Sequence, residues 1–402
     1  MSEREWDVVL YGATGFTGKR AAHYFAKNAP ADLKWAIAGR TKSKLEQLRA
    51  QLGRDDVGVI VADSSDVSSV EAMVARTRVM LSTAGPFALY GTPVVKACVD
   101  YGVHYVDITG ETPWVRSLID SFHDKAAADK TRIVPLCGYD SVPSDLGAWM
   151  MADHIRRELK QGTVEVRAAF SMSGGGLNGG TLASATNMSA AREGSQLYDV
   201  LLLNPSNRNT EEERRRSVDP LGVDYDEDFG RWMHPFVMGP VNTRVVRRSN
   251  ALFALEGRPY GSAFRYTERA DVSSRAKAYA ITGVLGGVGL LLSRRSGRWL
   301  ANKFGPKPGE GPSEEKIEGG YCRTRFVGVA EDGRKVQGKM EYLGDAGNKA
   351  TVLMVCECAL ALALQLNELP DRGGVLPPAV AFEGILLERL RQAGMVWEIL
   401  DS

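Results

Sequence analysis

Several signatures of common functional classes are missing from this chain of 402 residues. The net charge at pH 7 is only +1, which excludes a global field that attracts nucleic acid or a strongly acidic partner. The five cysteines are an odd number without a disulfide-like framework, so a reducing compartment fits best. The Cys356-x-Cys358 pair predicts core packing rather than metal binding, and the histidines lack metal-ligand spacing. We therefore expect no metal site.

Secretory and membrane-spanning segments are also lacking. The N-terminal sequence MSEREWDVVLYG has no apolar segment typical of a signal peptide, so we expect a cytoplasmic protein. The uncharged stretch from Tyr279 to Leu292 is shorter than the roughly 20 residues that a spanning helix needs. Two interpretations remain open for this apolar segment. It is either a buried glycine-rich helix or dimer face, or a surface helix that contacts lipid or lines an acyl-chain groove.

The order of strand and helix patterns predicts an α/β fold with a second domain. Residues 1–145 alternate apolar strand runs with helical patterns, which is typical of a Rossmann-like, doubly wound parallel sheet. Residues 146–345 contain antiparallel strand patterns, one pair joined by a hairpin turn at Asp332-Gly333, and predict an α+β domain for substrate binding or dimerisation. Residues 346–402 predict two helices that pack back on the Rossmann domain.

The segment VVLYGATGFTGKR, from Val8 to Arg20, places three glycines directly after a predicted strand and before a predicted helix. In a dinucleotide site the first glycine allows a tight turn, the second lets a pyrophosphate approach, and the third lets the helix pack closely on the strand. The helix N-terminus then attracts the phosphates. We predict a pyrophosphate loop formed by Gly12, Ala13, Thr14, Gly15, Phe16, Thr17 and Gly18.

The end of the second predicted strand distinguishes between the two nicotinamide cofactors. An NAD site usually has an acidic residue there, whereas this chain reads AIAGRTKSK, with Arg40 and Thr41 at the strand end. A guanidinium binds a 2′-phosphate in bidentate fashion and stacks on adenine. We therefore predict NADP(H), and not NAD(H), as the cofactor.

Other strand ends predict the rest of the site. Asp63 and Ser64 follow the third strand and are expected to face the adenine, whereas Ala84, Gly85 and Pro86 follow the fourth and are expected to pass the nicotinamide. Proton transfer needs a nearby donor, and the candidates are Tyr139, Asp140 and Tyr90. A structural role remains open for each. No Tyr-x-x-x-Lys motif occurs at Tyr11, Tyr90 or Tyr139, which disfavours the mechanism of the short-chain dehydrogenases.

These segments together resemble the saccharopine dehydrogenase-like oxidoreductases, and among them the trans-acting enoyl reductases of mycobacterial lipid synthesis. The resemblance covers nearly the whole chain and rests on segments such as DVVLYGATGFTGK, STAGPFALYGTPVVKACVDYGVHYVDITGE, GYDSVPSDLG, PVNTRVVRRSNAL and GGVLPPAVAFEGILLERL. It implies a Rossmann domain, a second α+β domain, a nicotinamide cofactor and hydride delivery to a lipid or polyketide acyl chain. In some relatives it implies association with a membrane or lipid droplet.

Two other functions stay open. The first is an amino-acid-type dehydrogenase acting on a C–N bond, for which Arg244, Arg247 and Arg248 would be candidate substrate contacts. The same arginines could bind the phosphates of a carrier arm or be solvated. The second is an NADP-binding protein without turnover at a membrane or lipid droplet, since no unambiguous proton donor is evident.

Overall fold

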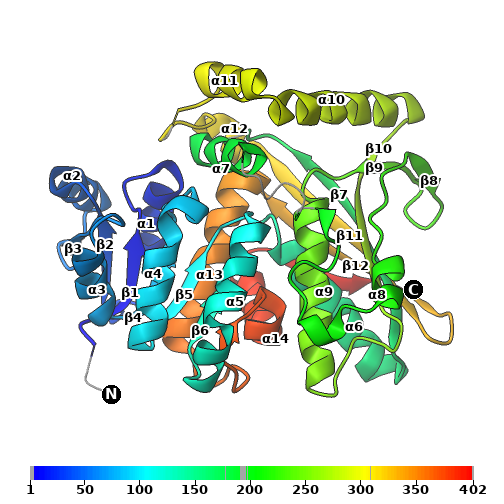
Figure 1. Ribbon diagram of the computed structural model, residues 1–402, viewed down its shortest axis with the longest axis horizontal. Coiled ribbons are helices and arrows are strands. Elements are labelled where there is room, and N and C mark those ends of the chain that lie inside the picture. The colour runs from blue at the N-terminus through cyan, green and yellow to red at the C-terminus, as the bar shows by residue number, and fades with distance from the viewer. Residues whose placement is uncertain (1–3, 177, 191–195, 197, 308, 401–402) are drawn as a thin grey trace.

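The computed structural model describes residues 4–176, 178–190, 196, 198–307 and 309–400 (Figure 1). The chain forms two seven-stranded sheets, here called sheet A and sheet B, with helices packed on and between them. Sheet A is built mainly from the N-terminal third, drawn in blue and cyan in Figure 1. Sheet B lies on the opposite side of the molecule and is drawn mainly in green and yellow.

Sheet A is entirely parallel and has the strand order β3-β2-β1-β4-β5-β6-β13. Its strands are β1 (Trp6–Tyr11), β2 (Trp35–Gly39), β3 (Gly58–Val61), β4 (Thr77–Ser82), β5 (His104–Asp107), β6 (Arg132–Val134) and β13 (Gly374–Val375). The strand order reverses between β1 and β4, and such a switch point is where α/β sheets bind their ligands. The predicted doubly wound sheet is therefore confirmed.

Helices cover both faces of sheet A, and alternate strand residues face each layer. In β1, Val8 and Leu10 pack in the same core as α1 (Phe16–Asn28), whereas Val9 and Tyr11 pack in the opposite core. The first layer also contains α2 (Lys42–Leu52) and α13 (Thr351–Leu364), and the second contains α3 (Val67–Ala75), α4 (Phe87–Tyr101) and α5 (Thr112–Ala128). Burial on both faces explains the continuous apolar strand sequences.

Helix α4 begins well before its proline. Proline is tolerated best in the first turn of a helix, but α4 starts at Phe87 and contains Pro93 in its interior. The cause is a distant carboxylate: Glu111 accepts hydrogen bonds from the backbone N–H groups of Phe87 (2.9 Å) and Ala88 (3.0 Å). This contact satisfies amide groups that a helix N-terminus leaves unpaired.

Sheet B is mixed, with the order β14-β12-β11-β7-β10-β9-β8, and only the β7–β10 pair is parallel. The predicted hairpin is confirmed, because β11 and β12 pair antiparallel around Gly333, which has a φ of +86°. One face of the sheet packs against α6 (Val142–His154). The strands are β7 (Thr163–Ser173), β8 (Asp224–Asp226), β9 (Arg231–Pro235), β10 (Arg265–Val272), β11 (Tyr321–Ala330), β12 (Lys335–Leu343) and β14 (Val396–Leu400).

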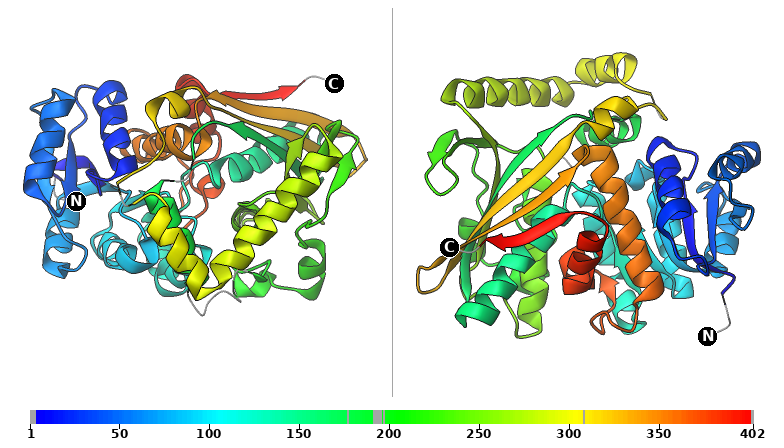
Figure 2. Two further views of the ribbon diagram at one scale, coloured as in Figure 1. Left: turned by 90° about the horizontal axis from the view of Figure 1, so that it is seen from above. Right: turned by 180° about the vertical axis from the view of Figure 1, so that it is seen from behind.

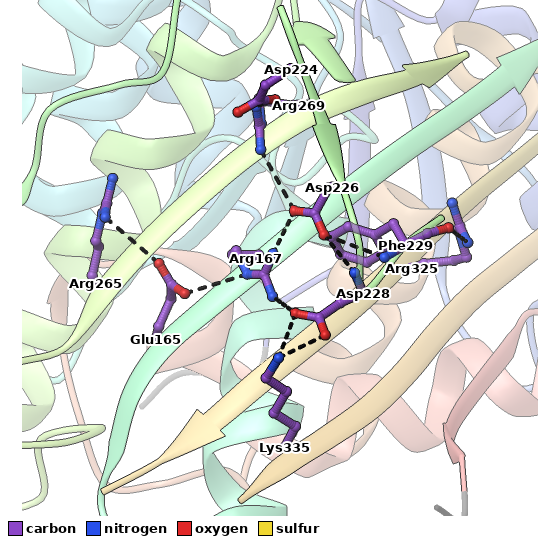
Figure 3. A network of polar contacts seen from close by, with 10 residues as sticks. All are labelled: Glu165, Arg167, Asp224, Asp226, Asp228, Phe229, Arg265, Arg269, Arg325 and Lys335. Atoms are coloured by element: carbon purple, nitrogen blue, oxygen red, sulfur yellow. Dashed lines mark hydrogen bonds and ion pairs between the residues drawn. The ribbon is translucent and has the colours of Figure 1, made fainter. Parts of the chain in front are cut away.

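The other face of sheet B carries a network of charged side chains (Figure 3). Arg167 on β7 forms ion pairs with Asp226 and Asp228. The Nζ of Lys335 lies 2.7 Å from a carboxylate oxygen of Asp228, and the guanidinium groups of Arg167 and Arg325 lie over the ring of Phe229. These contacts hold the loop after β8 across the sheet and neutralise its carboxylates.

The remaining helices connect or cover these layers. Helix α9 (Gly239–Leu255) packs on α6 and β10, and α14 (Pro378–Gln392) packs on α13 and α6. Short helices α8 (Glu211–Arg216) and α12 (Glu314–Glu318) lie in connecting segments. Helices α7 (Gly179–Ala190), α10 (Arg275–Ser293) and α11 (Arg295–Phe304) lie together at the top of Figure 1.

Among the residues that the structure describes, two helical stretches are long and apolar enough to cross a membrane by length and composition alone. The stretch that ends with α13, from Ala346 to Leu364, is 83% buried, and Cys356 and Cys358 lie in the core as predicted. Only 6% of α10 is buried. Of the alternatives left open for Tyr279–Leu292, the buried helix is therefore wrong, since nearly all of the side chains of α10 lie outside the core. The dimer face and the contact with lipid remain predictions.

Candidate functional site

The glycine loop after β1 is shaped by close approach to its neighbours. Gly12 has a φ of +84°, and a Cβ atom there would lie 2.9 Å from the backbone N of Ala84. A Cβ atom at Gly18 would lie 2.2 Å from the carbonyl oxygen of Gly12. Gly12 thus allows the tight turn and Gly18 the close packing of helix on strand, as the sequence predicts.

The N-terminus of α1 fits a pyrophosphate. No side chain caps the helix at Gly15, and its first turn contains no acidic residue. The first amide groups of a helix lack partners within the helix and carry the positive end of its dipole. A Cβ atom at Gly15 would come closest to the Gly12 carbonyl oxygen, at 3.3 Å, so the space beyond it stays open. Phosphate oxygens can approach this backbone directly. Contact of the cofactor with Ala13, Thr14, Phe16 and Thr17 remains a prediction.

A segment from the second half of the chain lies over this loop. A Cβ atom at Gly311 would lie 2.3 Å from the ring of Phe16, so only glycine fits at this contact. Arg20 on α1 forms an ion pair with Glu314, and its guanidinium lies 4.5 Å from the centre of the Phe16 ring. We call residues 309–314 the strap. The strap joins α11 to the edge of the pyrophosphate loop.

The ends of β2 and β3 carry the residues predicted to bind the adenosine half of the cofactor. Arg40 is exposed and forms no hydrogen bond or ion pair with any residue that the structure describes. Asp63 accepts hydrogen bonds from the backbone N–H (3.0 Å) and hydroxyl (2.8 Å) of Ser65. These bonds lower the pKa of Asp63, and the nearby charge of Arg40 adds to the effect. A free guanidinium at this edge is available for a 2′-phosphate. The roles of Thr41, Asp63 and Ser64 remain predictions.

The end of β4 is fixed by a buried carboxylate that sequence reasoning missed. The Gly85–Pro86 peptide bond is cis, and α4 begins directly after it. Glu111, besides binding the first amides of α4, accepts a hydrogen bond from the Ser184 hydroxyl on α7 at 2.7 Å. Glu111 therefore joins the predicted nicotinamide-side loop, Ala84 to Pro86, to α7. It lies 24 positions after Phe87 in the sequence, so no local motif could reveal this contact.

Asp140, after β6, has the properties of a proton-transferring group. It is partly buried and forms no hydrogen bond with other described residues, and loss of hydration raises its pKa to about 6. A Cβ atom at Gly110 would lie 4.0 Å from Asp140 Oδ2 and 3.6 Å from Met238 Cε. The absent side chain of Gly110 leaves space between these groups. A perturbed, unpartnered carboxyl at the ligand-binding edge is a candidate catalytic group.

The two tyrosines singled out by the sequence differ from Asp140. Tyr139 is 3% exposed, its ring is edge-on to Phe170 on sheet B, and burial raises the pKa of its hydroxyl well above the usual range. This position favours the packing role that the sequence left open. Tyr90 is 43% exposed on the second turn of α4. It remains a candidate on the open side of the edge.

A second buried carboxyl was also missed by sequence reasoning. Glu268 on β10 accepts hydrogen bonds from the Ser144 hydroxyl (2.6 Å), the Tyr266 hydroxyl (2.8 Å) and the Asn242 side-chain amide (2.8 Å). Burial raises its pKa to about 7. Asn242 also accepts a hydrogen bond from Ser141, next to Asp140, at 3.3 Å. The residue after Asp140 is thus held by a network from the second domain.

The three arginines of α9 hold the fold and are not free for a substrate. Arg244, Arg247 and Arg248 are all buried. The first two form ion pairs with Asp219, and Arg248 donates hydrogen bonds to the carbonyl oxygens of Leu203 and Val375. Of the alternatives left open for these arginines, solvated side chains are therefore excluded. These contacts tie the segment before β8 to the body of the protein.

Comparisons with known proteins show the family of the chain. Residues 8–134 match the family model described as the saccharopine dehydrogenase NADP binding domain. A protein of Mycobacterium tuberculosis (strain ATCC 25618 / H37Rv), provisionally named a trans-acting enoyl reductase, is 39% identical over 98% of this chain and 97% of the relative. A trans-acting enoyl reductase of Mycobacterium ulcerans (strain Agy99) is 36% identical over 98% of each chain.

A solved structure shares the fold. The apo saccharopine dehydrogenase (L-Glu forming) of Saccharomyces cerevisiae aligns with a TM-score of 0.53 over 98% of this chain and 99% of that chain, at 12% identity. At this identity the likeness concerns the fold alone. Together, the Rossmann sheet, the pyrophosphate loop and relatives that match end to end show that the chain belongs to the saccharopine dehydrogenase-like family, among the trans-acting enoyl reductases, and is an NADP-dependent oxidoreductase.

Proposed function

We propose that the chain reduces a carbon–carbon double bond of a lipid or polyketide acyl substrate with NADPH. The names of the relatives, trans-acting enoyl reductases over nearly their whole length, support this reaction. Within the molecule the proposal is carried by Asp140, an unpartnered carboxyl at the ligand-binding edge of sheet A with its pKa raised to about 6. Such a group retains part of its proton near neutral pH.

In this reaction different residues of the chain would donate the proton and bind the cofactor. Bound NADPH supplies the hydride, and the carbon beside the substrate carbonyl must then receive a proton. In the proposal Asp140 donates this proton from its carboxyl and recovers one from water, which reaches a partly buried residue. In the proposal the reacting carbons lie beside Gly110, which has no side chain to separate them from Asp140. Arg40 binds the 2′-phosphate, and the N-terminus of α1 orients the pyrophosphate.

The buried arginines weigh against the alternative reaction at a C–N bond. An amino-dicarboxylate substrate needs free cationic groups, whereas Arg247 and Arg248 are buried and bonded to groups of the protein. A role without turnover would leave the unpartnered carboxyl of Asp140 unexplained. The loss of hydration at Asp140 costs stability, and such a cost is typical of functional sites.

The deciding experiment measures NADPH oxidation by the purified protein with a trans-2-enoyl thioester, and in parallel with a keto acid plus an amino acid. We expect oxidation with the enoyl thioester only, with a saturated product detected by mass spectrometry. Oxidation with the keto acid pair alone would establish the C–N reaction. Tight NADPH binding without oxidation by either would establish the role without turnover.

Variants of Asp140 test the proton donor. Asp140→Asn should lower kcat by about 10²–10⁴-fold without weakening NADPH binding, as expected for loss of a general acid. The wild-type kcat should fall as pH rises above about 6, because the acid form of Asp140 is lost, and the variant should lose this dependence. Asp153→Asn, at the far end of α6, is the matched control. An unchanged pH profile in Asp140→Asn would remove Asp140 from the mechanism.

A variant of Arg40 tests the predicted binding of the 2′-phosphate. Arg40→Ala should weaken NADPH binding by roughly 1.5–3 kcal/mol, the range for hydrogen bonds to a charged group, and leave NADH binding unchanged. The measurement compares the two Kd values in the wild type and the variant. An equal loss for both cofactors would show that Arg40 does not bind the 2′-phosphate.

A further inference from the structure

The most exposed apolar surface of the molecule is formed by α10 and α11. Viewed from above, the two helices form an angled pair on the outside of the body (Figure 2). Only Ala278 in α10 and Gly297 in α11 are buried. We call this the α10–α11 surface. Its large exposed apolar side chains are Tyr279, Ile281, Val284, Val288, Leu290, Leu291, Trp299, Leu300 and Phe304.

The charge of this surface has one sign. Between Val272 and Gly309 the sequence has no Asp or Glu, and its seven basic residues are Arg275, Lys277, Arg294, Arg295, Arg298, Lys303 and Lys307. The structure gives none of these seven an ion pair with another described residue. The whole chain has a net charge of only +1, so the positive charge is local. The surface is therefore complementary to an apolar layer with an anionic boundary.

We propose that the α10–α11 surface docks the protein on an anionic lipid bilayer, with both helices lying in the plane of the membrane. Exposed apolar side chains flanked by basic residues are typical of helices that lie at a membrane interface. Trp299 and Phe304 are 58% and 76% exposed, and Lys303 Nζ lies 4.7 Å from the centre of the Trp299 ring. Aromatic and basic side chains anchor proteins at the level of the lipid headgroups.

The dimensions of α10 favour this position over crossing the membrane. The uncharged run from Ala278 to Ser293 has 16 residues, which extend about 24 Å as a helix, whereas the hydrocarbon core is about 30 Å thick. Both ends are basic, and α11 turns back directly after Arg294. Helix α10 packs on β9 and α11 packs on α7, so both helices remain along the body.

Charge also distinguishes the bilayer from a second copy of the chain. In a symmetric dimer the same surface faces itself, and seven cations from each copy would then be brought together without an acidic partner. Anionic lipid headgroups supply that partner, and the aliphatic side chains of α10 enter the acyl boundary. The bilayer is therefore the occupant that satisfies both features of the surface.

The docked surface is physically connected to the reaction edge. Helix α11 packs on α7, and Ser184 of α7 donates a hydrogen bond to Glu111, which holds the first turn of α4 after Pro86. From α11 the chain continues into the strap, whose Gly311 contacts Phe16 of the pyrophosphate loop. In the proposed orientation the bilayer lies next to the two segments that border the cofactor.

The test is co-sedimentation of the full chain with vesicles of phosphatidylcholine, with and without phosphatidylserine. We expect binding to the anionic vesicles that weakens with added salt, and little binding to the neutral ones. The double variant V284D/V288D should lower vesicle affinity about tenfold or more, because it places two anions in the apolar face. The matched control is Leu221→Asp, which also replaces an exposed apolar side chain by a carboxylate but lies outside this surface. The control should bind like the wild type.

Folding is monitored by NADPH affinity and thermal unfolding, which V284D/V288D should leave unchanged. Three outcomes would overturn the proposal. The first is absence of binding to anionic vesicles by the wild type, and the second is equal binding to neutral vesicles. The third is a dimer that V284D/V288D dissociates, without vesicle binding, since it would assign the surface to a second copy of the chain.

Discussion

Helix α10 and the stretch Ala346–Leu364, which ends with α13, are equal in length and similar in hydropathy, yet they lie in opposite environments. Both are long and apolar enough to span a membrane, but 6% of α10 is buried against 83% of the stretch that ends with α13. Helix α13 lies between sheet A and the rest of the fold, next to α1 and α14. Helix α10 lies on the outside, as Figures 1 and 2 show. Hydropathy alone therefore does not predict whether an apolar helix is buried in the core or exposed on the surface.

The charges around α10 and α13 distinguish the two helices better than their hydropathy does. Glu357 within α13 is paired with Arg389 on α14 at 2.7 Å and accepts a hydrogen bond from Tyr24 on α1 at 2.6 Å. Each buried charge of α13 has a partner, as a protein core requires. The cations that flank α10 have no carboxylate partner in the described structure. A paired acid in an apolar helix is typical of a core, whereas unpaired cations at both ends are typical of a surface.

The largest contrast between the two helices should come from one charge introduced into each. Leu360→Asp buries an unpaired carboxylate in the core around α13, and we expect a loss of about 4 kcal/mol or more in the free energy of unfolding, or no folded protein. Val288→Asp on α10 should change the free energy by no more than about 0.5 kcal/mol. Urea unfolding measures both. Equal losses would mean that α10 is covered by protein in solution.

A smaller difference between the core and the α10–α11 surface should appear in the dependence of stability on pH. Asp145 on α6 is buried and accepts hydrogen bonds from the Ser249 hydroxyl on α9 and the Ala379 amide on α14, and burial raises its pKa to about 7. The folded state thus binds a proton that the unfolded state releases near its ordinary pKa of about 4. Stability should be fully present below about pH 4 and should decrease from there to about pH 7.

This pH effect is measured as the difference in Tm between the wild type and Asp145→Asn at several pH values. The Tm of the variant should rise relative to that of the wild type as pH increases toward 8. A difference in Tm that does not vary with pH would show that Asp145 does not titrate in the folded protein.

The smallest change in stability should come from substituting a glycine of α10. A Cβ atom at Gly287 would meet no atom within 4 Å, so Gly287→Ala adds helix propensity without a clash. We expect a gain of up to about 1 kcal/mol. Hydrogen exchange of the α10 amides measures the gain locally. A loss of stability would mean that the glycines serve close packing against a partner.

The sequence predicted those parts of the fold that depend on local pattern. The alternation of strands and helices predicted β1 to β6 of sheet A but not the edge strand β13, and the glycine spacing predicted the turn at Gly12 and the close packing at Gly18. The β11–β12 hairpin followed from Asp332-Gly333. In each case the determining residues lie within a few positions of one another. Local signals therefore sufficed.

The parts that could not be predicted depend on contacts between distant residues. The start of α4 is fixed by Glu111, and the network beside Asp140 depends on Glu268, which is 124 positions from its partner Ser144. The burial of Arg248 depends on carbonyl oxygens of other elements. The exposure of α10 depends on which apolar segments pack together. No motif in the sequence encodes these pairings.

The C-terminal segment has a consequence for how the protein is made. Helix α13 fills one face of sheet A, and β13 extends its edge by pairing with β6. The N-terminal domain therefore exposes apolar surface on β1 and β4 until residues 351–375 have left the ribosome. Domains usually fold in order during synthesis, but this one cannot be completed first. Until then the uncovered apolar surface favours aggregation of the nascent chain.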